Sequence, residues 1–144
     1  MPASNAENCV FCKIIRDDLA AAVVYEDESS VAFLDARPLF PGHVLLVPKQ
    51  HHETLMDLPA ELVEPLFKNA QMIGKAVEQA MAAQGVFVAM NNRVSQSVPH
   101  LHVHIVPRSK GDGLKGFFWP RHTYEDDAHI ERVRAEIEAA VQTI

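Results

Sequence analysis

Alternation of apolar and polar positions predicts several short β-strands. In the clearest case, Pro-His-Leu-His-Val-His-Ile-Val-Pro-Arg at 99–108, histidines alternate with large aliphatic residues, which is the period of a strand with two unlike faces. We therefore expect the three histidines to share one face and the aliphatic residues to pack on the other. The strand-like segments are Val23–Tyr25, Val31–Asp35, Val44–Pro48, Val86–Met90 and His100–Val106.

A 3.6-residue period of apolar positions predicts two helices. The longer one runs from about Pro59 to Ala83, and Gly85 is a suitable stop. Pro65 has no amide hydrogen, so we expect it to begin the main helix after a short first turn, with a kinked helix as the alternative. The second helix begins at Asp126 or Asp127, and its apolar stripe is expected to pack on the sheet or on a second subunit.

The order of these elements predicts an α+β fold with a five-stranded, mainly antiparallel sheet, one long central helix and a C-terminal helix. The histidine strand should be central or nearly so. The chain has 144 residues, without an internal repeat or a Gly/Ser/Pro-rich linker, so one domain over 1–144 is expected. The polar start at 1–8 is expected to be flexible.

The composition and charge of the chain limit the classes of molecule that it is expected to bind. A net charge of −6 and a pI near 5.7 argue against a general nucleic-acid binder, because such binding needs a basic surface. An anionic ligand would have to be held by local donors. We find neither a secretory signal pattern nor an apolar run of about twenty residues, so a cytoplasmic protein with no membrane partner is expected.

Three interpretations of the histidine row remain open. Ordinary core or surface histidines are the simplest. A three-histidine metal site is difficult to build from residues spread over about 13 Å of one strand. The third interpretation is nucleophilic catalysis at phosphorus by the middle imidazole: a neutral ring offers a lone pair near pH 7, and a backbone carbonyl can hold its other N–H.

Two cysteines form the pair Cys9-x-x-Cys12. By itself this spacing is compatible with a redox pair, with zinc ligands or with simple packing. A thioredoxin-like motif would need a parallel βαβ context, which the strand order does not suggest. A zinc site would need two further ligands from elsewhere in the chain.

The chain resembles the histidine triad (HIT) family of nucleotide hydrolases and transferases. His-Leu-His-Val-His-Ile-Val at 100–106 matches the family's His-x-His-x-His-x-x signature, in which x is apolar. The resemblance extends to Cys-Val-Phe-Cys-Lys-Ile-Ile at 9–15, Val-Ala-Phe-Leu-Asp at 31–35, Pro-Gly-His-Val-Leu-Leu-Val-Pro-Lys at 41–49 and Gln-Ser-Val-Pro-His at 96–100. It weakens in the family's variable C-terminal tail, which comprises the tail and helix at 109–144.

The resemblance implies a HIT-like fold, a homodimer and a purine nucleotide substrate, with no organic cofactor. The implied activity is hydrolysis of a nucleoside 5′-phosphoramidate or a dinucleoside polyphosphate at the α-phosphate, through a nucleotidyl-histidine intermediate. One alternative is a nucleotidyl transferase or phosphorylase that uses the same intermediate. The other is a non-catalytic nucleotide-binding scaffold.

The resemblance also assigns roles to individual residues. His102 is the nucleophile, His104 donates to a phosphate oxygen, and His100 supports them from the flank. Side chains before the triad reach the scissile bond and the phosphate; these are Gln96, Ser97 and Asn91. The nucleoside is held by Asp35 at the ribose hydroxyls and by Phe11, Ile14 and Leu19 around the purine, with His43 behind the active site. Phe11 and Ile14, at helical spacing, suit core packing equally well.

Family members with a cysteine pair imply a structural zinc held by Cys9, Cys12, His51 and His100. His52, adjacent to His51, should then be dispensable. One segment departs from the family: Asn-Asn-Arg-Val-Ser-Gln at 91–96 is shorter than the usual phosphate loop and has no glycine, so Arg93 is a candidate for supplying charge there.

Three consecutive aromatic residues, Phe117, Phe118 and Trp119, follow the triad. Such a cluster is unlikely to stay in water. We expect it either to cap the nucleotide site or to pack the C-terminal helix on the sheet. Lys115 and Arg121 flank the cluster and are candidates for binding a polyphosphate leaving group.

Overall fold

The computed structural model describes residues 6–114 and 121–144. It consists of two compact units, Met1–Asp112 and Gly113–Ile144. The sheet and the histidine row belong to the first unit. The aromatic run 117–119 and Lys115 lie outside the described residues.

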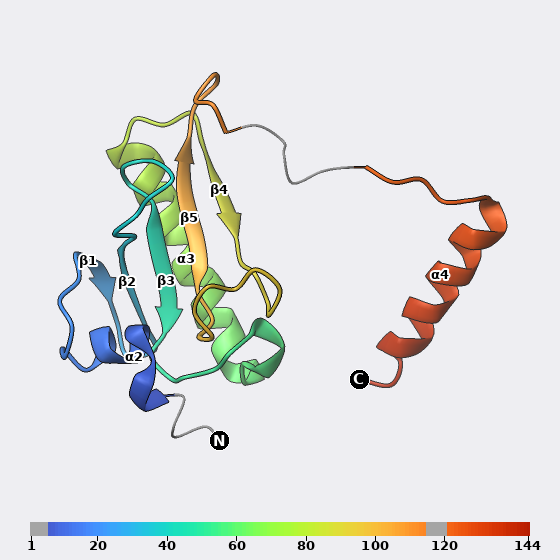
Figure 1. Ribbon diagram of the computed structural model, residues 1–144, viewed down its shortest axis with the longest axis horizontal. Helices are drawn as coiled ribbons and strands as arrows, with labels where there is room; N and C mark the ends of the chain where they lie inside the picture. Colours follow the sequence, from blue (N-terminus) through green and yellow to red (C-terminus); the bar gives the residue numbers. More distant parts are fainter. Residues whose placement is uncertain (1–5, 115–120) are drawn as a thin grey trace. The chain divides into compact units, whose positions relative to one another are not determined.

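Five antiparallel strands form one open sheet in the first unit (Figure 1). In spatial order they are β1 (Val23–Glu26), β2 (Ser30–Leu34), β3 (Val44–Pro48), β5 (Val103–Arg108) and β4 (Gly85–Ala89). The prediction of a five-stranded antiparallel sheet is confirmed. β5 carries the last triad histidine and lies between β3 and the edge strand β4, so the near-central position expected for this strand is also confirmed.

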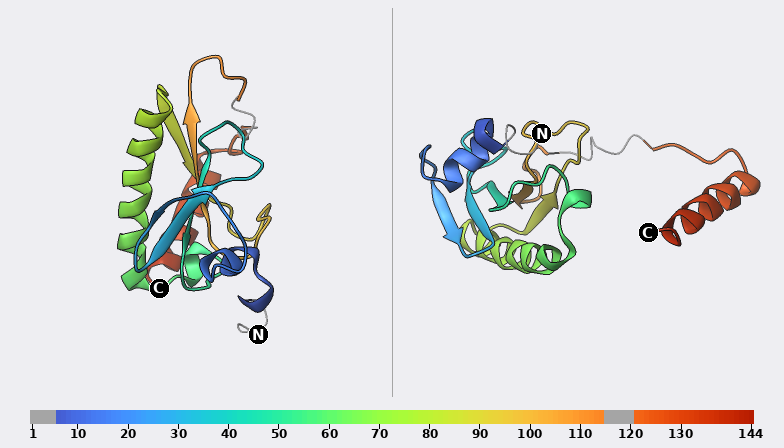
Figure 2. Two further views of the ribbon diagram at one scale, coloured as in Figure 1. Left: turned by 90° about the vertical axis from the view of Figure 1, so that its left-hand side faces the viewer. Right: turned by 90° about the horizontal axis from the view of Figure 1, so that it is seen from below.

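Helix α3 (Ala60–Ala80) covers one face of the sheet (Figure 2). Its buried residues Leu66, Ile73 and Val77 belong to the same core cluster as Leu46 of β3 and Ile105 of β5. The helix and the sheet therefore enclose the main hydrophobic core, and burial of this apolar face is the dominant stabilising contribution.

Pro65 lies inside α3, which is one continuous helix from Ala60. The prediction that Pro65 begins the main helix was therefore wrong. A proline here removes one backbone hydrogen bond. Apolar residues on both sides of it, Leu62 and Leu66, nevertheless pack on the core cluster. Tertiary packing of an amphipathic face thus outweighs the local propensity.

The opposite face of the sheet carries the short helix α2 (Val10–Ile15) and, with it, a second core cluster (Figure 2). Residues 6–8 are also helical. Cys9, Phe11 and Cys12 pack here against the sheet residues Val31, Phe33, Leu45 and Val47. This second cluster borders the histidine row, because His104 pairs with Leu45 across β5 and β3.

A buried polar contact ties the β1–β2 turn to α3. The Asn69 amide donates to Asp27 at 2.8 Å and to the Ser30 hydroxyl at 2.7 Å. Burial alone would raise the pKa of Asp27, but the hydrogen bonds from Asn69, Ser29 and Ser30 outweigh it and lower the pKa below the ordinary value. The carboxylate is therefore ionised at neutral pH and holds the hairpin on the helix.

Two further helical elements complete the described chain. The 3₁₀ turn η1 (Leu55–Asp57) has a capping box between Thr54 and Asp57. Helix α4 (Asp127–Val141) begins where the sequence predicted, with the Asp126 carboxylate accepting from the His129 amide. None of the described helices is both long and apolar enough to cross a membrane.

Candidate active site

The histidine row runs into β5 but does not lie wholly within it. β5 begins at Val103, so His104 is in the strand, while His100 and His102 belong to the extended segment before it. The predicted strand start at His100 was therefore wrong. The strand begins later because the segment before it is bonded elsewhere: the Leu101 amide donates to the His52 carbonyl, in the segment that follows β3, at 2.7 Å.

The alternation itself is preserved through this segment. Leu101, Val103 and Ile105 are completely buried on the α3 side, as predicted. On the other side, the rings of His102 and His104 lie with centroids 5.0 Å apart. Phe11 of α2 contacts both His100 and His102, with ring centroids 5.9 and 5.1 Å away.

His102 has its tautomer determined by a backbone contact. Its Nδ1 lies 2.8 Å from the His100 carbonyl oxygen. A carbonyl can only accept a hydrogen bond, so Nδ1 carries the proton and Nε2 of the neutral ring carries a lone pair. His102 as a whole residue is 3% exposed, and burial lowers the pKa of its ring below the ordinary histidine value. His102 is therefore neutral at pH 7, with the protonation expected of a nucleophile.

His104 contacts a second histidine, and both belong to a small cluster with Asp35. His104 Nδ1 lies 3.0 Å from His43 Nε2, and Asp35 Oδ2 lies 3.7 Å from the same His43 nitrogen. Burial and the neighbouring His102 and His43 lower the pKa of His104 to about 4. Burial also lowers the pKa of His43, although Asp35 acts in the opposite direction. Both rings are therefore neutral at pH 7.

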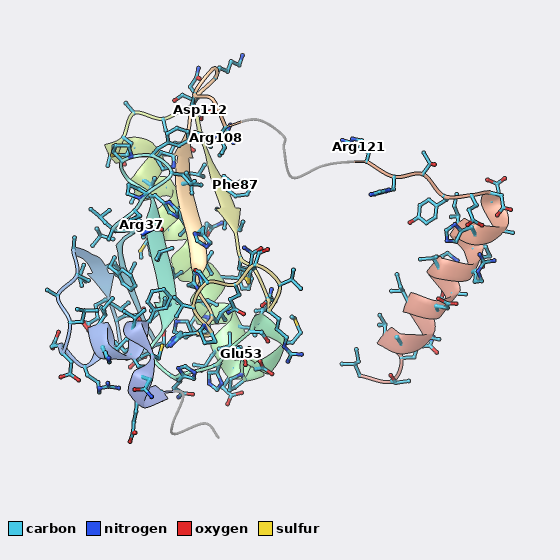
Figure 3. The ribbon with its side chains drawn as sticks, in the orientation of Figure 1. Arg37, Glu53, Phe87, Arg108, Asp112 and Arg121 are labelled. Carbon is cyan, nitrogen blue, oxygen red and sulfur yellow. The ribbon has the colours of Figure 1, made fainter. Side chains whose placement is uncertain are left out.

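Asp35 follows β2 directly and remains partly exposed. Its Oδ1 accepts the Arg37 amide at 2.9 Å, which holds the carboxylate in place. Arg37 itself lies in the β2–β3 loop (Figure 3). Through its proximity to His43, the Asp35 carboxylate belongs to the same cluster as His104. Contact with ribose hydroxyls stays a prediction.

The loop 91–96 is held together by the side chains that were expected to contact the substrate. The Asn91 amide donates to the Ser95 carbonyl at 3.1 Å. Gln96 accepts from the Arg93 amide at 2.8 Å and donates to the carbonyl of Glu53 at 2.6 Å, in the segment between β3 and α3 (Figure 3). Both amides therefore stabilise the loop in this conformation. Their predicted contacts with substrate remain untested.

The same loop contains two residues in the left-handed backbone conformation that glycine adopts most easily, although neither of them is glycine. Arg93 and Ser95 have φ of 76° and 61°, in the left-handed region that costs energy for residues with a side chain. The Gln96 and Asn91 hydrogen bonds hold this conformation. Arg93 is exposed, and its guanidinium is 3.9 Å from Asp57. Ser97, the other residue predicted before the triad, is exposed.

Cys9, Cys12, His51 and His100 converge in a compact cluster, with all four ligand atoms within 4.8 Å of one another. The Sγ–Nδ1 distances are 3.4 Å for Cys9–His100, 3.5 Å for Cys12–His100 and 3.2 Å for Cys12–His51. Sulfur and nitrogen ligands of a tetrahedral zinc are about 3.5 Å apart, given Zn–S of about 2.3 Å and Zn–N of about 2.0 Å. The cluster therefore fits a tetrahedral metal.

The tautomer of His100 supports the same conclusion. His100 is completely buried, and its Nε2 lies 2.8 Å from the Pro48 carbonyl oxygen. This contact places the proton on Nε2 and leaves a lone pair on Nδ1, the atom that faces the cysteines. A backbone acceptor behind a ligating histidine is the usual arrangement in metal sites. His52, which the sequence analysis judged dispensable, is not in the cluster and contacts Gln50.

The three residues predicted around the purine have different environments. Phe11 is 5% exposed and packs in the second core cluster, beside His100 and His102. Ile14 is partly buried against the same cluster. Leu19 is 42% exposed. Phe11 thus has the core packing that was weighed for it, and a purine-binding role for the three stays a prediction.

Backbone groups that the sequence analysis missed complete the site. The Leu39 amide donates to His43 Nδ1 at 3.1 Å, and the carbonyls of Pro48 and His100 accept from the triad. No residue type marks such groups, because every residue except proline carries the same donor and acceptor. The Thr54–Asp57 capping box was also not predicted, although a threonine followed three residues later by an acidic residue is a sequence signal for it.

The chain belongs to the HIT family. The HIT domain family model matches residues 16–111. Among curated relatives, the Protein hit of Bacillus subtilis (strain 168) is 42% identical over 120 residues, which cover 81% of this chain and 82% of the relative. The adenosine 5′-monophosphoramidase HNT1 of Saccharomyces cerevisiae is 36% identical over 123 residues, or 83% and 74% of the two chains.

Solved structures agree with this assignment. A HIT family member from Bacillus subtilis superposes with a TM-score of 0.84 at 36% identity, covering 92% of this chain and 96% of the other. A zinc-bound histidine triad family protein from Mycobacterium smegmatis superposes with a TM-score of 0.72 at 33% identity, covering 96% and 99%. The HIT-like fold predicted from the sequence is confirmed.

Phe11 and Leu19 provide a matched pair for testing core packing. We expect Phe11→Ala to lower the free energy of unfolding by about 3 kcal/mol, because it leaves a cavity in the second core cluster. Leu19→Ala should change it by less than about 0.5 kcal/mol, since that side chain is already exposed. Urea denaturation followed by circular dichroism measures both. Equal losses of stability in the two variants would contradict the core assignment.

Proposed function

We propose that this protein hydrolyses a nucleoside 5′-phosphoramidate or a dinucleoside polyphosphate at the α-phosphate, through a nucleotidyl intermediate on His102. The observation that carries the proposal is the hydrogen bond from His102 Nδ1 to the His100 carbonyl, which leaves the Nε2 lone pair available for attack. Membership of the HIT family and the name of the yeast phosphoramidase support the same reaction class.

In the first step, His102 Nε2 forms a bond to the α-phosphorus while the bond to the leaving nitrogen or oxygen breaks. The leaving group departs with the bonding electrons; a phosphate oxygen leaves as an anion, whereas a leaving nitrogen also takes up one proton from solvent and leaves as a neutral amine. The ring of His102 gains positive charge as the bond forms. Its Nδ1–H then donates more strongly to the His100 carbonyl, so this contact stabilises the transition state more than the resting enzyme.

In the second step, water attacks the same phosphorus. The bond between the phosphorus and His102 Nε2 breaks, and its electrons return to that nitrogen. One proton of the attacking water goes to solvent. The products are a nucleoside monophosphate and the neutral ring of the resting enzyme. His104 is proposed to donate to a phosphate oxygen in both steps, and Asp35 to accept from the ribose hydroxyls.

Two alternatives keep part of this chemistry. A phosphorylase or nucleotidyl transferase would form the same intermediate and pass the nucleotide to orthophosphate or another acceptor. Product analysis with and without orthophosphate separates it from a hydrolase. A non-catalytic nucleotide-binding scaffold would bind the nucleotide without turnover. In that case His102→Ala would leave nucleotide binding unchanged, and there would be no catalytic rate for it to lower.

His102→Ala tests the intermediate. We expect kcat for adenosine 5′-phosphoramidate to fall by about 10³-fold or more, because no other group replaces a covalent nucleophile. His52→Ala is the control, since His52 lies outside the site, and its kcat should match the unmodified protein. Rapid quenching with radiolabelled substrate should trap label on protein only where His102 is present. A near-normal rate in His102→Ala would reject the mechanism.

We also propose that Cys9, Cys12, His51 and His100 hold a structural zinc ion. The tetrahedral spacing of their ligand atoms supports this, as does the zinc-bound relative from Mycobacterium smegmatis. A bound zinc would cross-link α2 to the segment before β5 and would leave no open position for chemistry. His100 would then join the metal to the nucleophile, because its ring ligates the ion while its carbonyl accepts from His102.

Adjacent histidines test the zinc proposal. We expect one zinc per purified chain by plasma mass spectrometry, a strong loss in His51→Ala and full retention in His52→Ala. Removal of the ion by a chelator should lower the melting temperature, because the ion binds only the folded chain. A metal-free protein whose melting temperature a chelator does not change would contradict the site.

The homodimer implied by the family resemblance remains part of the proposal. β4 is an edge strand of the described sheet, and edge strands are frequent sites of contact with a second chain. Beside it, α3 and β4 border a groove of about 550 Å³ that includes Gly74 and Val86. We expect sedimentation equilibrium to give twice the chain mass of 16.0 kDa. Gly74→Arg should shift the protein toward monomer, and a monomeric unmodified protein would contradict the proposal.

A further inference from the structure

We propose that Cys9 and Cys12 form a site of reversible oxidation, at which a peroxide converts the two thiols into one disulfide and thereby releases the metal ion. The release rests on the zinc ion proposed above, whereas the disulfide requires only the two thiols. The chain has two cysteines in all, and both are free thiols in the structure. Each is therefore the other's partner for a disulfide within one chain.

The two thiols lie on the first turn of α2. Cys9 is the N-cap residue, and its carbonyl accepts the Lys13 amide at 3.0 Å. Residues three apart on a helix lie on the same face. The two sulfur atoms accordingly belong to a group of ligand atoms that all lie within 4.8 Å of one another. Side-chain rotation and a small shift at the start of the helix are enough to bring them together.

The Cys/His cluster is less buried at His51 than elsewhere. Cys9 and Cys12 are 6% and 5% exposed, and His100 is completely buried. His51 is only partly buried, and its Nδ1 lies 3.2 Å from Cys12 Sγ. Helix α2 has six residues and no side-chain cap, so few hydrogen bonds of its own oppose local opening. A small, uncharged oxidant such as hydrogen peroxide therefore reaches the sulfurs past His51.

The oxidation takes two steps. Metal binding keeps both sulfurs as thiolates, and the thiolate is the form that attacks an oxidant. One thiolate attacks a peroxide oxygen, the O–O bond breaks, hydroxide leaves and the sulfur becomes a sulfenic acid. The second thiolate attacks that sulfur, the S–O bond breaks, a second hydroxide leaves and the disulfide forms. Two electrons pass from the sulfurs to the peroxide, and two hydroxides replace two thiolates, so charge is conserved.

The disulfide and the bound metal exclude each other. Sulfur ligates zinc as a thiolate, and the sulfurs of a disulfide carry no negative charge. Oxidation leaves two imidazoles, those of His51 and His100, which are half of the four ligands that a structural zinc site requires. The ion is then released. A dithiol reductant reverses the step, because thiol–disulfide exchange restores both thiols and the site can be filled again.

The same helix contacts the nucleophile of the proposed function. Phe11 lies between the two cysteines in the sequence, and its ring centroid is 5.1 Å from that of His102. His100 Nδ1 lies 3.4 and 3.5 Å from the two sulfurs, and the His100 carbonyl accepts from His102. A rearrangement of the sulfurs therefore reaches the His102 ring along two short paths, one through Phe11 and one through His100.

Titration of the zinc-containing protein with hydrogen peroxide tests the proposal without substrate. We expect one zinc ion to be released per chain, measured with a chromophoric indicator, in step with the loss of both thiols and of two hydrogen atoms in mass. Peptide mapping should link Cys9 to Cys12. His52→Ala keeps all four ligands and should respond as the unmodified protein does. Cys12→Ser lacks one sulfur and should give no product lighter by two hydrogen atoms.

Activity provides a second measurement. We expect kcat for adenosine 5′-phosphoramidate to fall by about 10- to 100-fold on oxidation, as is common when an outer partner of a reactive group is disturbed. A dithiol reductant with added zinc should restore the rate. This recovery separates the disulfide from methionine sulfoxide, which needs an enzyme for its reduction.

Separate outcomes identify what has failed. Retention of both thiols and of zinc under peroxide would overturn the oxidation site, as would zinc release with sulfinic acids or with disulfides only between chains. If Cys12→Ser does not fold, as judged by its melting curve, the peptide map of the unmodified protein decides the question. A metal-free chain that forms the Cys9–Cys12 disulfide would reject the zinc ion and its release, while the oxidation site stands. Coupled release without hydrolysis of any nucleotide would reject the proposed function alone.

Discussion

The whole site depends on one backbone carbonyl, that of His100. It accepts from His102 Nδ1 at 2.8 Å and thereby leaves the lone pair of His102, the next histidine in the chain, on Nε2. The carbonyl is itself held, because the His100 amide donates to Val98 and its ring donates to Pro48. A short extended segment thus orients the His102 ring, although it lies outside the strands of the described sheet.

The three triad histidines share a sequence pattern but not a chemical state. Each ring meets a partner whose role cannot change: a carbonyl for His100, a carbonyl for His102 and, through His43, an amide for His104. Acceptors and donors of the main chain therefore assign one proton to each ring. Burial lowers the pKa of all three, so these assignments hold at neutral pH. Identical side chains thus differ in which ring nitrogen carries the proton, because the backbone around each ring differs, and the proposed function assigns a different role to each.

Much of this could be predicted from sequence, and the remainder has definable causes. Periods of 2 and 3.6 residues identified the sheet and α3, because burial of one face dominates their stability. They did not locate the start of β5, where the Leu101 amide bonds to His52 across a distant segment, or the continuity of α3 through Pro65. The Cys9–Cys12 pair was ambiguous until the family resemblance supplied His51 and His100. The contact of Leu39 with His43 had no signal in the sequence, because it is made by the backbone amide of Leu39 and not by its side chain.

The Cys/His cluster can form only late during synthesis on the ribosome, because its members are far apart in the sequence. Cys9 and His100 are 91 residues apart in the chain, yet their side chains meet. Helix α2 has six residues, too few to be stable alone in water. It precedes the segment around His100 in the chain and can dock only after that segment has left the exit tunnel. The two thiols therefore remain fully accessible to oxidants and stray metal ions until the segment around His100 has emerged, and the docking of α2 is what ends that full exposure.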